Sequence, residues 1–405
     1  MSGVACSKSN RHRICDSCTG CSACAMVCPT QAIGVSANKE GFYQADIDDS
    51  KCIKCGACEK VCPERTNYSD KKQIHQQKFY ACRNLDLKIV RESSSGGVFS
   101  AIAKDIIEMG GSVYGVIIEY PSCEITYTRA TSLSEISAMR GSKYVQAHLS
   151  RLTLEMFMED VEKDNPVLFV GTSCYVAGIK KILEFKHIKY NNVVFVDFIC
   201  AGVISTKLWN AEVEHFSREI GEISKAGFRD KKRGWRDFSV VFENSAHKRE
   251  QRFTLSAIGL LQSIDEALGV ACNNCRYRSY EKPGDITIGD FWNEQYLPSR
   301  WWDDKGVSTV MVNTKCGEEM LHACDKDLEI IPVEKHMVFN SRFSGDYKEI
   351  EWKKRDDMYN DVENMEYSSF KKKWIRVTFK DYILLGIIRP IFLKLGLHRL
   401  KKNER

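Results

Sequence analysis

The chain has 405 residues, enough for two or three domains with a well-buried core. Its net charge of +5 is too small to indicate nucleic-acid binding, and no run of 18 apolar residues predicts an ordinary transmembrane helix. Eighteen cysteines would suggest a secreted disulfide protein, but residues 1–13 are polar and lack the apolar core of a signal peptide. We therefore expect a cytoplasmic protein whose cysteines serve as thiolates.

One cysteine pattern occurs twice near the start of the chain. It reads Cys18-x2-Cys21-x2-Cys24-x3-Cys28-Pro29 and then Cys52-x2-Cys55-x2-Cys58-x3-Cys62-Pro63. This is the ligand pattern of bacterial ferredoxins with two [4Fe–4S] clusters, in which the fourth cysteine of each run binds the other cluster. Zinc sites pair two-cysteine knuckles instead. The spacing predicts one cluster on Cys18, Cys21, Cys24 and Cys62, and a second on Cys52, Cys55, Cys58 and Cys28.

The repeated pattern also predicts the first domain. Cys15 adds a competing register with Cys18, but the Cys28-Pro29 end fixes the frame, so we interpret Cys15 as a spare thiol. An internal repeat of this kind is typical of a compact dicluster ferredoxin, which we place at residues 1–66. Residues 67–78 are polar and are interpreted as a linker.

Residues 79–345 alternate apolar strand-like runs with helical periods, the pattern of an α/β sheet. The predicted strands span residues 113–118, 167–170, 193–199 and 285–288, and a helix is predicted at residues 98–109. The fold class is therefore α+β overall, with an N-terminal bacterial-type dicluster ferredoxin module fused to a larger α/β domain.

A serine- and glycine-rich turn, Glu92-Ser-Ser-Ser-Gly-Gly97, precedes the predicted helix. Such a turn presents free backbone N–H groups to an anion such as a pyrophosphate. The alternative is a helix cap without any ligand, which serine commonly forms. The loop Arg140-Gly-Ser-Lys-Tyr144 is also basic and contains glycine, and the same two interpretations apply to it.

Four further cysteines lie beside predicted strands. Cys174 and Cys200 each follow one, and Cys272 and Cys275 form a Cys-x2-Cys pair shortly before another. Because loops at the carboxyl ends of adjacent parallel strands converge on one crevice, four thiolates there would make a third cluster site. Zinc binding and unrelated buried cysteines stay open as alternatives.

Residues 346–405 form a basic tail that we expect to be helical. From Lys371 to Arg405, eleven positive side chains stand against two negative ones. Two short apolar runs, 383–388 and 391–393, are interrupted by Pro390. One hypothesis is an interfacial amphipathic helix on anionic lipid, which would give peripheral membrane contact. The other is a final helix packed on the protein, or a docking arm for a partner.

Five short motifs occur in order along the larger domain. They are Ser-Ser-Gly-Gly at 94–97, Gly-Ser-Lys-Tyr-Val at 141–145, Gly-Thr-Ser-Cys at 171–174, Phe-Ile-Cys-Ala-Gly at 198–202 and Gly-Asp-Ile-Thr-Ile-Gly-Asp-Phe-Trp at 284–292. With these motifs the chain resembles the beta subunit family of coenzyme F420 hydrogenase/dehydrogenase, here with a fused ferredoxin module, over residues 14–345. The resemblance implies an oxidoreductase whose α/β domain binds FAD and carries its own [4Fe–4S] cluster.

The resemblance also implies roles for individual residues. The third cluster would be bound by Cys174, Cys200, Cys272 and Cys275. The flavin would be contacted by Ser94, Ser95, Gly96, Gly97, Lys143, Gly171 and Thr172.

Two motifs depart from the family pattern. The usual Gly-Thr-Pro-Cys-Gln reads Gly171-Thr-Ser-Cys-Tyr175, and the usual Cys-His-Gly reads Cys200-Ala-Gly202. Ala201 in place of histidine removes a proton donor or a hydrogen bond to the cluster, a change that alters redox potential or substrate choice. The use of F420 itself is therefore left open.

The function that the resemblance implies is that of an iron–sulfur flavoprotein. It would pass electrons between a two-electron organic substrate, F420 or another compound, and one-electron carriers. Two alternatives stay open: a ferredoxin-dependent reductase of a sugar or lipid-linked biosynthetic intermediate, and a non-catalytic electron-relay subunit. We expect a redox partner, either a ferredoxin-like protein or a deazaflavin, and no nucleic acid. The motifs encode neither the catalytic residues nor the direction of electron flow.

Overall fold

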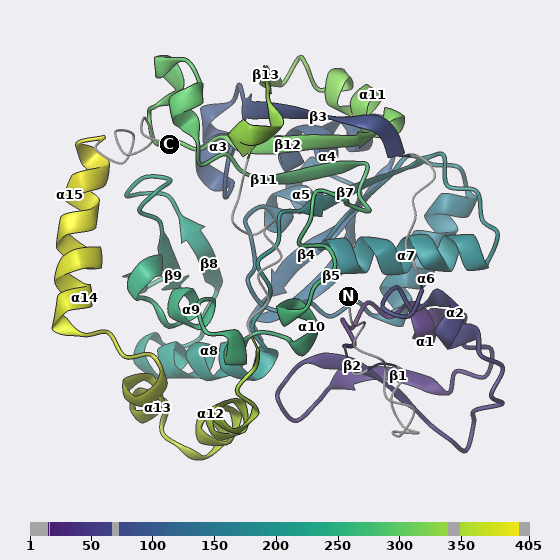
Figure 1. Ribbon diagram of the computed structural model, residues 1–405, viewed down its shortest axis with the longest axis horizontal. Coiled ribbons are helices and arrows are strands. Elements are labelled where there is room, and N and C mark those ends of the chain that lie inside the picture. Colours follow the sequence, from purple (N-terminus) through teal and green to yellow (C-terminus); the bar gives the residue numbers. More distant parts are fainter. Residues whose placement is uncertain (1–14, 16, 67–72, 339–348, 397–405) are drawn as a thin grey trace.

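A computed structural model describes Cys15 and residues 17–66, 73–338 and 349–396. The first part is a small module in which β1 (Ile33–Ala37) pairs antiparallel with β2 (Tyr43–Ile47) beside two short helices, α1 (Ala23–Val27) and α2 (Ala57–Val61) (Figure 1). Both helices start after a residue with positive φ, and both end at a cysteine with nearly the same backbone angles, φ −72° and ψ 113° at Cys28, φ −71° and ψ 114° at Cys62. The doubled cysteine pattern thus folds as a doubled structural unit, as predicted for a ferredoxin-type domain.

An eight-stranded mixed sheet forms the centre of the larger domain, in the order β13-β3-β12-β11-β7-β6-β4-β5. Its strands are β3 (Gln73–Asn84), β4 (Ser112–Glu119), β5 (Glu124–Ala130), β6 (Val167–Val170), β7 (Val193–Phe198), β11 (Ile286–Asp290), β12 (Ser308–Thr314) and β13 (Leu328–Val333). The neighbours β4, β6, β7 and β11 run parallel, and the strands outside them pair antiparallel. The four predicted strands are confirmed as β4, β6, β7 and β11.

The predicted linker is too long. β3 begins at Gln73, so residues 73–78 belong to the sheet, while residues 67–72 lie outside the described part of the chain. The polar residues at this end of β3 have partners there: the Gln77 amide donates to the Tyr280 carbonyl and to Asn313 Oδ1, both at 2.7 Å, and Lys78 pairs with Glu318. Polar composition therefore misidentified a strand end as a linker.

Helices cover both faces of the sheet. α4 (Val98–Glu108), α5 (Leu133–Met139) and α11 (Lys315–Ala323) pack on one face, and α6 (Arg151–Glu162) and α7 (Ser173–Phe185) on the other. α3 (Leu87–Glu92) precedes α4. The buried residues of α4 recur at helical spacing along its sequence, so its apolar stripe faces the core. This confirms the helix that was predicted after the serine–glycine turn.

A second, smaller unit stands beside the sheet. Its antiparallel strands are β8 (Lys225–Asp230), β9 (Ser239–Glu243) and β10 (Lys248–Arg252). They share a core with helices α8 (Thr206–Ile220), α9 (Ala257–Leu261), α12 (Trp352–Asn364) and α13 (Tyr367–Trp374). Short helices complete the connections: α10 (Val270–Asn273), η1 (Phe253–Leu255), η2 (Asp265–Ala267), η3 (Glu294–Tyr296), η4 (Ser299–Trp301) and η5 (Lys335–Val338).

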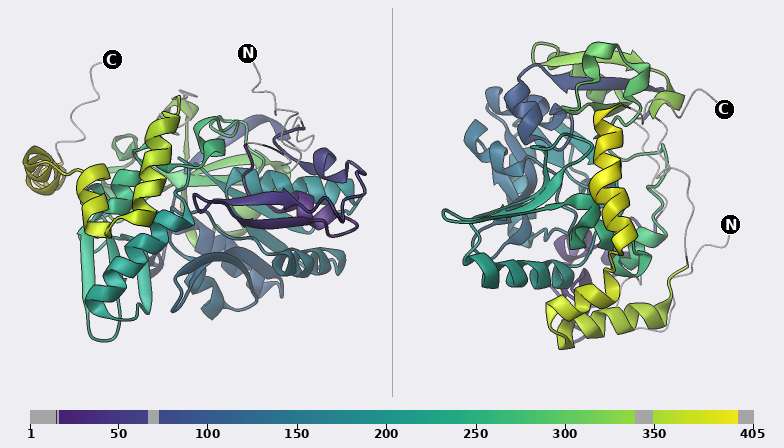
Figure 2. Two further views of the ribbon diagram at one scale, coloured as in Figure 1. Left: turned by 90° about the horizontal axis from the view of Figure 1, so that it is seen from below. Right: turned by 90° about the vertical axis from the view of Figure 1, so that its left-hand side faces the viewer.

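The chain's last described segment is a helical rod along the outside of the small unit (Figure 2). It consists of α14 (Phe379–Ile383), the π-helical turn η7 (Leu384–Ile388) and α15 (Arg389–Lys394). The tail is helical as predicted up to this point, and its last basic residues, Arg399 to Arg405, lie outside the described residues. None of the described helices combines the length and apolarity that crossing a membrane requires.

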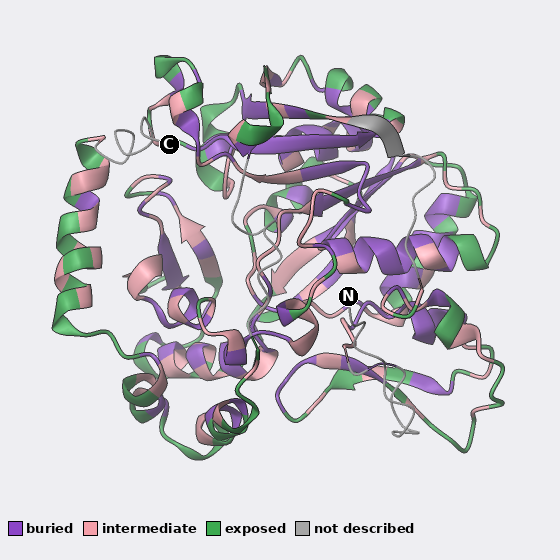
Figure 3. Cartoon of the chain, in the orientation of Figure 1, coloured by how far each residue is buried: buried purple, intermediate pink, exposed green. Residues whose placement is uncertain are grey.

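The ferredoxin-type module is joined to the rest by buried polar contacts. Gln146 accepts a hydrogen bond from the Tyr43 N–H at 2.6 Å and donates to the Thr19 carbonyl at 2.9 Å. Arg355 of α12 is fully buried and pairs with Glu40, with Nη2 at 2.6 Å from Oε2. The apolar core of α1 is continuous with that of α6 and α7, and Figure 3 shows buried residues on both sides of this contact. The two parts therefore pack as one structure.

Candidate functional site

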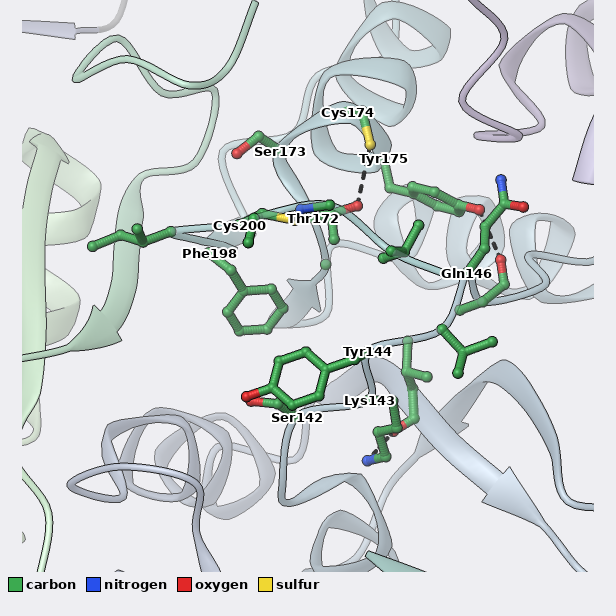
Figure 4. Close-up of a pocket in the computed structure, with 18 of the residues that line it drawn as sticks. Ser142, Lys143, Tyr144, Gln146, Thr172, Ser173, Cys174, Tyr175, Phe198 and Cys200 are labelled. Carbon is green, nitrogen blue, oxygen red and sulfur yellow. Dashed lines mark hydrogen bonds between the residues drawn. The ribbon is translucent and has the colours of Figure 1, made fainter. Parts of the chain in front are cut away.

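A cavity of about 410 Å³ lies where the carboxyl ends of the central strands, the small unit and the ferredoxin-type module meet. Its size is within the range of about 300–1,000 Å³ that is usual for small-molecule sites. Many aromatic side chains line it, among them Tyr144 and Phe198, which are labelled in Figure 4. The cavity is thus suited to a large planar ligand.

The four cysteines predicted for a third cluster all line this cavity. Cys174 is the second residue of α7, directly after β6, and Cys200 follows the neighbouring parallel strand β7. Cys272 lies in α10, where a Cβ on Gly202 would come within 3.2 Å of the Cys272 Cβ. The structure therefore brings together four thiols, of which the first, Cys174, and the last, Cys275, are about 100 residues apart in sequence.

These thiols lie in an environment that disfavours free thiolates. Burial raises the pKa of Cys174 well above its usual value, and the neighbouring thiols Cys275, Cys272 and Cys200 raise it further. Burial likewise raises the pKa of Cys272 to about 12 and that of Cys275 to about 11. Four buried thiolates are stable together only beside strong positive charge, which metal ions supply.

The spacing of the thiols bears on the kind of metal site. Among the described residues, no group of three or more His, Cys, Asp or Glu side chains forms a ready-made metal-ion site. Each ligand of one zinc ion lies about 2.3 Å from it, whereas the ligands of a four-iron cluster bind different irons and lie further apart. Iron and zinc analysis of the purified chain would distinguish these two kinds of site.

The ferredoxin cysteines fall into two differently exposed sets. Cys18, Cys21, Cys24 and Cys62, the predicted first set, surround a cavity of about 20 Å³ together with Cys15. Burial raises the pKa of Cys21 to about 12. In the second set, Cys28, Cys52 and Cys58 are half-buried and Cys55 is exposed.

Helix α7 connects the first set to the thiols of the large cavity. Cys174 lies in its first turn, and Gly178, one turn later, packs against Cys21, since a Cβ on Gly178 would lie 2.7 Å from Cys21 Sγ. Cys18 and Glu64 line both cavities. The two thiol sets are therefore neighbours across a single helix turn.

The serine–glycine turn borders the cavity at the start of α4. Ser94, Ser95 and Gly97 line it, whereas Gly96 lies behind the lining, where its N–H donates to Ser308 Oγ at 2.9 Å. Gly97 precedes the helix with φ +85°, and no side chain caps α4. The first backbone N–H groups of α4 are thus left for water or an anion.

Two serines of this turn already have protein partners. Ser94 Oγ accepts from the Ser142 N–H at 2.7 Å, which ties the two glycine-containing loops together. Ser95 Oγ donates to the Val307 carbonyl at 2.6 Å. Their hydroxyls shape the turn, so the backbone N–H groups are the stronger anion-binding candidates.

Lys143 lines the cavity, but its charge is directed elsewhere. Its Nζ donates to the carbonyls of Val116, Met139 and Arg140 at 2.7, 2.9 and 3.2 Å. Burial lowers its pKa to about 7. Figure 4 shows the side chain turned away from Thr172 and Cys174. Lys143 thus closes the end of α5, and its place in the cavity lining keeps it a predicted flavin contact, while its ammonium group is held by backbone carbonyls.

Gly171 and Thr172 occupy the turn from β6 into α7. A Cβ on Gly171 would lie 2.4 Å from the Tyr127 hydroxyl, so this position requires glycine. Thr172 is the N-cap residue of α7, and its hydroxyl lies 3.2 Å from Cys174 Sγ (Figure 4). Thr172 therefore contacts a predicted cluster ligand directly.

The two departures from the family pattern have visible consequences. Tyr175, where glutamine is usual, is buried, stacks on Tyr127 at 5.3 Å and donates to the Ala147 carbonyl at 2.7 Å. At Ala201, where histidine is usual, the backbone carbonyl accepts from Arg278 Nη2 at 3.0 Å. Arg278 lines the cavity, so a permanent cation stands close to Cys200.

Several lining residues were missed by the sequence reasoning. Glu64, Arg229, Tyr277 and Arg278 belong to no motif, and only the fold brings them to the cavity. Glu64 and Arg278 lie two and three residues from predicted ligands, a proximity that would have identified them as candidates.

Comparison with known proteins gives a consistent assignment. The family model described as "Coenzyme F420 hydrogenase/dehydrogenase, beta subunit" matches in two parts, its N-terminal part at residues 79–153 and its C-terminal part at residues 164–336. A model for a 4Fe-4S dicluster domain matches residues 17–66. No curated protein matches the chain.

Among solved structures, one chain of "Xenon derivatization of the F420-reducing [NiFe] hydrogenase complex from Methanosarcina barkeri" is similar at 16% identity and a TM-score of 0.47, covering 75% of this chain and 94% of that chain. The two parts of the family model together span more than half of the sequence. The chain therefore belongs to the coenzyme F420 hydrogenase/dehydrogenase beta subunit family, whose members are oxidoreductases, and carries a 4Fe–4S dicluster domain at its N-terminal side.

Proposed function

We propose that this chain is an iron–sulfur flavoprotein that exchanges electrons between a two-electron organic substrate and one-electron carriers. FAD would occupy the 410 Å³ cavity, and [4Fe–4S] clusters would occupy the three thiol sets. When bound, a flavin takes up two electrons as a hydride and releases them singly, while each cluster carries one. The observation that carries the proposal is the shared border of the two cavities at Cys18 and Glu64.

Each of the three thiol sets would supply four cysteines to one cluster. Cys174 and Cys200 follow two neighbouring strands, Cys272 lies in α10 and Cys275 follows that helix, and all four line the cavity. Arg278 adds positive charge beside Cys272 and Cys200. Such charge and hydrogen bonding near the thiolates tune a cluster's potential.

The flavin proposal rests on the other side of the same cavity. The uncapped start of α4 would bind a phosphate group through backbone N–H groups and the helix dipole. Gly97 suits the tight turn before α4, because it has a positive φ and because a Cβ there would lie 3.1 Å from Asn84 Cβ and 3.2 Å from Ile89 Cγ2. Aromatic side chains such as Tyr144 and Phe198 would pack on the planar ring system.

The exposed end of the ferredoxin-type module would serve as the outlet. Cys55 is exposed, and next to it the side chain of Ile53 is 64% exposed. A redox partner protein needs such close access to a cluster, and an exposed apolar side chain favours protein contact. We propose this edge as the docking point of a ferredoxin-like partner.

The test is anaerobic purification of the full chain with iron, sulfide and flavin analysis. Three clusters predict about twelve irons per chain, and the proposal adds one FAD. About eight irons would reject the third cluster, and a chain with all its iron but no flavin would reject the flavoprotein and favour the electron-relay subunit.

The substrate class is tested on the same preparation. Reduction by F420H2 or NAD(P)H in the absence of other donors would support a hydride substrate. Reduction by reduced ferredoxin alone would support the reductase of a biosynthetic intermediate.

We also propose peripheral membrane contact through the helical rod of residues 379–394. Leu384, Ile387, Ile391 and Leu395 follow one another at helical spacing and are 55%, 48%, 53% and 66% exposed. Lys380 and Lys394 stand on the same segment, and Lys372 and Arg376 precede it. An apolar stripe flanked by lysine and arginine is the composition of an interfacial helix on anionic lipid.

A further inference from the structure

One wall of the large cavity holds an arginine whose hydrogen-bonding capacity is only partly used. The Arg229 side chain is 4% exposed, and its Nη1 donates to Asp290 Oδ2 at 2.7 Å. Its Nε and Nη2 are buried and have no hydrogen-bond partner of good geometry in the described part of the chain, and the Tyr144 side chain lies beside the guanidinium. Buried donors nearly always have a hydrogen-bond acceptor in folded proteins, so a bound ligand is expected to supply one for these two atoms.

The unpaired atoms form one edge of the guanidinium group. Nε and Nη2 point in parallel, in the geometry that binds two oxygens of a carboxylate or phosphate at once. Burial lowers the pKa of Arg229, but Asp290 and Tyr144 outweigh this effect and raise it above the usual value. The group is therefore charged at every physiological pH.

The surroundings hold this edge in a fixed plane. The Arg229 Cζ lies 4.2 Å from the ring centroid of Phe238 and 5.7 Å from that of Trp292. Trp235 stacks on Trp292 at 4.6 Å, and its Nε1 donates to Asp290 Oδ1 at 3.3 Å. Phe238 and Trp292 also line the cavity, so a ligand that reaches Arg229 meets aromatic surface beside it.

We propose that the Nε/Nη2 edge of Arg229 binds a carboxylate or phosphate group of the organic ligand in this cavity, with an adjoining planar or apolar part of that ligand against Phe238 and Trp292. The inference rests on the proposed function and narrows it, because the substrate would be an organic acid or phosphate ester rather than a neutral compound. A phosphate of the flavin itself carries the same chemistry, and the experiment separates the two sources.

The probes are 2-naphthoate and its uncharged amide, 2-naphthamide, which have nearly the same shape. Their binding to the full chain is measured by isothermal titration calorimetry, and the FAD content is determined in parallel. Arg229→Lys keeps the charge beside Asp290 but lacks the fork, and Arg229→Gln with Asp290→Asn removes both charges and keeps the site neutral. Arg233→Gln is the control, because Arg233 belongs to the same part of the chain and its side chain is 47% exposed.

We expect wild type and Arg233→Gln to bind naphthoate at least about tenfold more tightly than naphthamide, and both Arg229 variants to lose this preference. Loss of the preference with FAD retained assigns the edge to the substrate. Loss of FAD in both Arg229 variants, with Arg233→Gln unaffected, assigns it to the flavin phosphate. An unchanged preference and unchanged FAD in both variants would overturn the inference. A wild-type chain that lacks flavin yet prefers naphthoate would reject the proposed function and support the subsite.

Discussion

At the scale of single residues, the cavity depends on glycines at positions where a side chain would be strained or crowded. Gly97 has φ +85°, and Gly96 lies where a Cβ would come within 2.4 Å of the Cys82 carbonyl oxygen. These two positions let the chain pass close behind the cavity and then expose the first N–H groups of α4. The anion site of the proposed flavin is thus made by backbone, not by side chains.

Gly97→Asp tests this backbone site. The new carboxylate would add a negative charge close to a flavin phosphate bound at the start of α4, so we expect loss of FAD with the ferredoxin irons retained. Gly97→Ala is the matched control: it carries the same left-handed backbone strain, about 1–2 kcal/mol, without the charge. Stoichiometric FAD in purified Gly97→Asp would show that the turn is an ordinary helix start.

What the sequence can predict differs from residue to residue for physical reasons. The spacing of metal ligands within a short segment can be recognised in the sequence. The eight ferredoxin cysteines and the pair Cys272 and Cys275 were therefore predictable. The resemblance implies Lys143 as a flavin contact, and it lines the cavity, but the sequence does not show that its ammonium is held by the carbonyls of Val116, Met139 and Arg140. Arg229 carries no motif, and only the packing of the small unit against the sheet makes it a cavity residue.

At the scale of elements, helix α7 contributes to both thiol sets through residues only four positions apart. Its first turn carries Cys174, and its second turn presents Gly178 to Cys21 of the ferredoxin-type module. The helix therefore sets the distance between the two thiol sets, and this distance depends on the size of the side chain at residue 178.

Gly178→Ala would place a methyl group 2.7 Å from Cys21 Sγ and 2.9 Å from Cys21 Cβ. Helix α7 and the loop that carries Cys21 cannot easily move apart to make room for the methyl group. We therefore expect a changed EPR signal or loss of about four irons from the first ferredoxin cluster. Gly34→Ala is the control within the same module, since a Cβ at Gly34 would meet no atom within 4 Å. Wild-type spectra for Gly178→Ala would contradict this role of α7.

The helical rod of residues 379–394 is the element most loosely tied to the body. Arg252 donates to the Gly386 carbonyl, and Arg389 donates to the Arg236 carbonyl at 3.2 Å. Phe370 and Ile375 upstream are buried and belong to the core of the small unit, so a truncation has to leave them in place.

Truncation after Arg376 should reduce sedimentation with phosphatidylserine vesicles. Each lysine or arginine near an anionic surface contributes about 1 kcal/mol, so added salt should weaken binding of the intact chain. Replacing Leu384, Ile387 and Ile391 by serine keeps the charge, and we expect it to weaken binding as well. Intact protein that ignores these vesicles, with unchanged iron and flavin, would leave the rod as a structural helix.

At the scale of the whole molecule, the ferredoxin-type module is part of the fold rather than an appendage. Polar composition at residues 67–78 suggests an independent module on a linker, but the contacts of Gln146, Ser22 and Arg355 fix its position. Contacts of this kind join residues more than about 100 positions apart and leave no local pattern. The four parallel strands of the sheet and helix α4 were predictable from periodicity, whereas the antiparallel strands and this docking were not.

The buried pair of Arg355 and Glu40 is the test of that docking. Arg355→Met leaves the Glu40 carboxylate unpaired, which should cost about 3–5 kcal/mol and lower the midpoint of anaerobic thermal unfolding. The neighbouring exposed pair of Lys39 and Asp356 serves as control, and Lys39→Met should cost about 0–1 kcal/mol. Equal effects of the two variants would mean that the module is held by apolar contacts alone.

The central claim is that electrons pass between a flavin in the large cavity and the ferredoxin clusters. They would pass through a cluster bound by Cys174, Cys200, Cys272 and Cys275. The most direct measurement is rapid mixing of anaerobic chain with reduced ferredoxin, following flavin absorbance, for wild type and for the double variant Cys174→Ala and Cys200→Ala. The control is Cys316→Ala, because Cys316 lies on α11 and belongs to none of the three predicted thiol sets. We predict that the double variant lacks about four irons, that its ferredoxin clusters still become reduced, and that its flavin is no longer bleached. Flavin bleaching at the wild-type rate in the double variant would contradict the account.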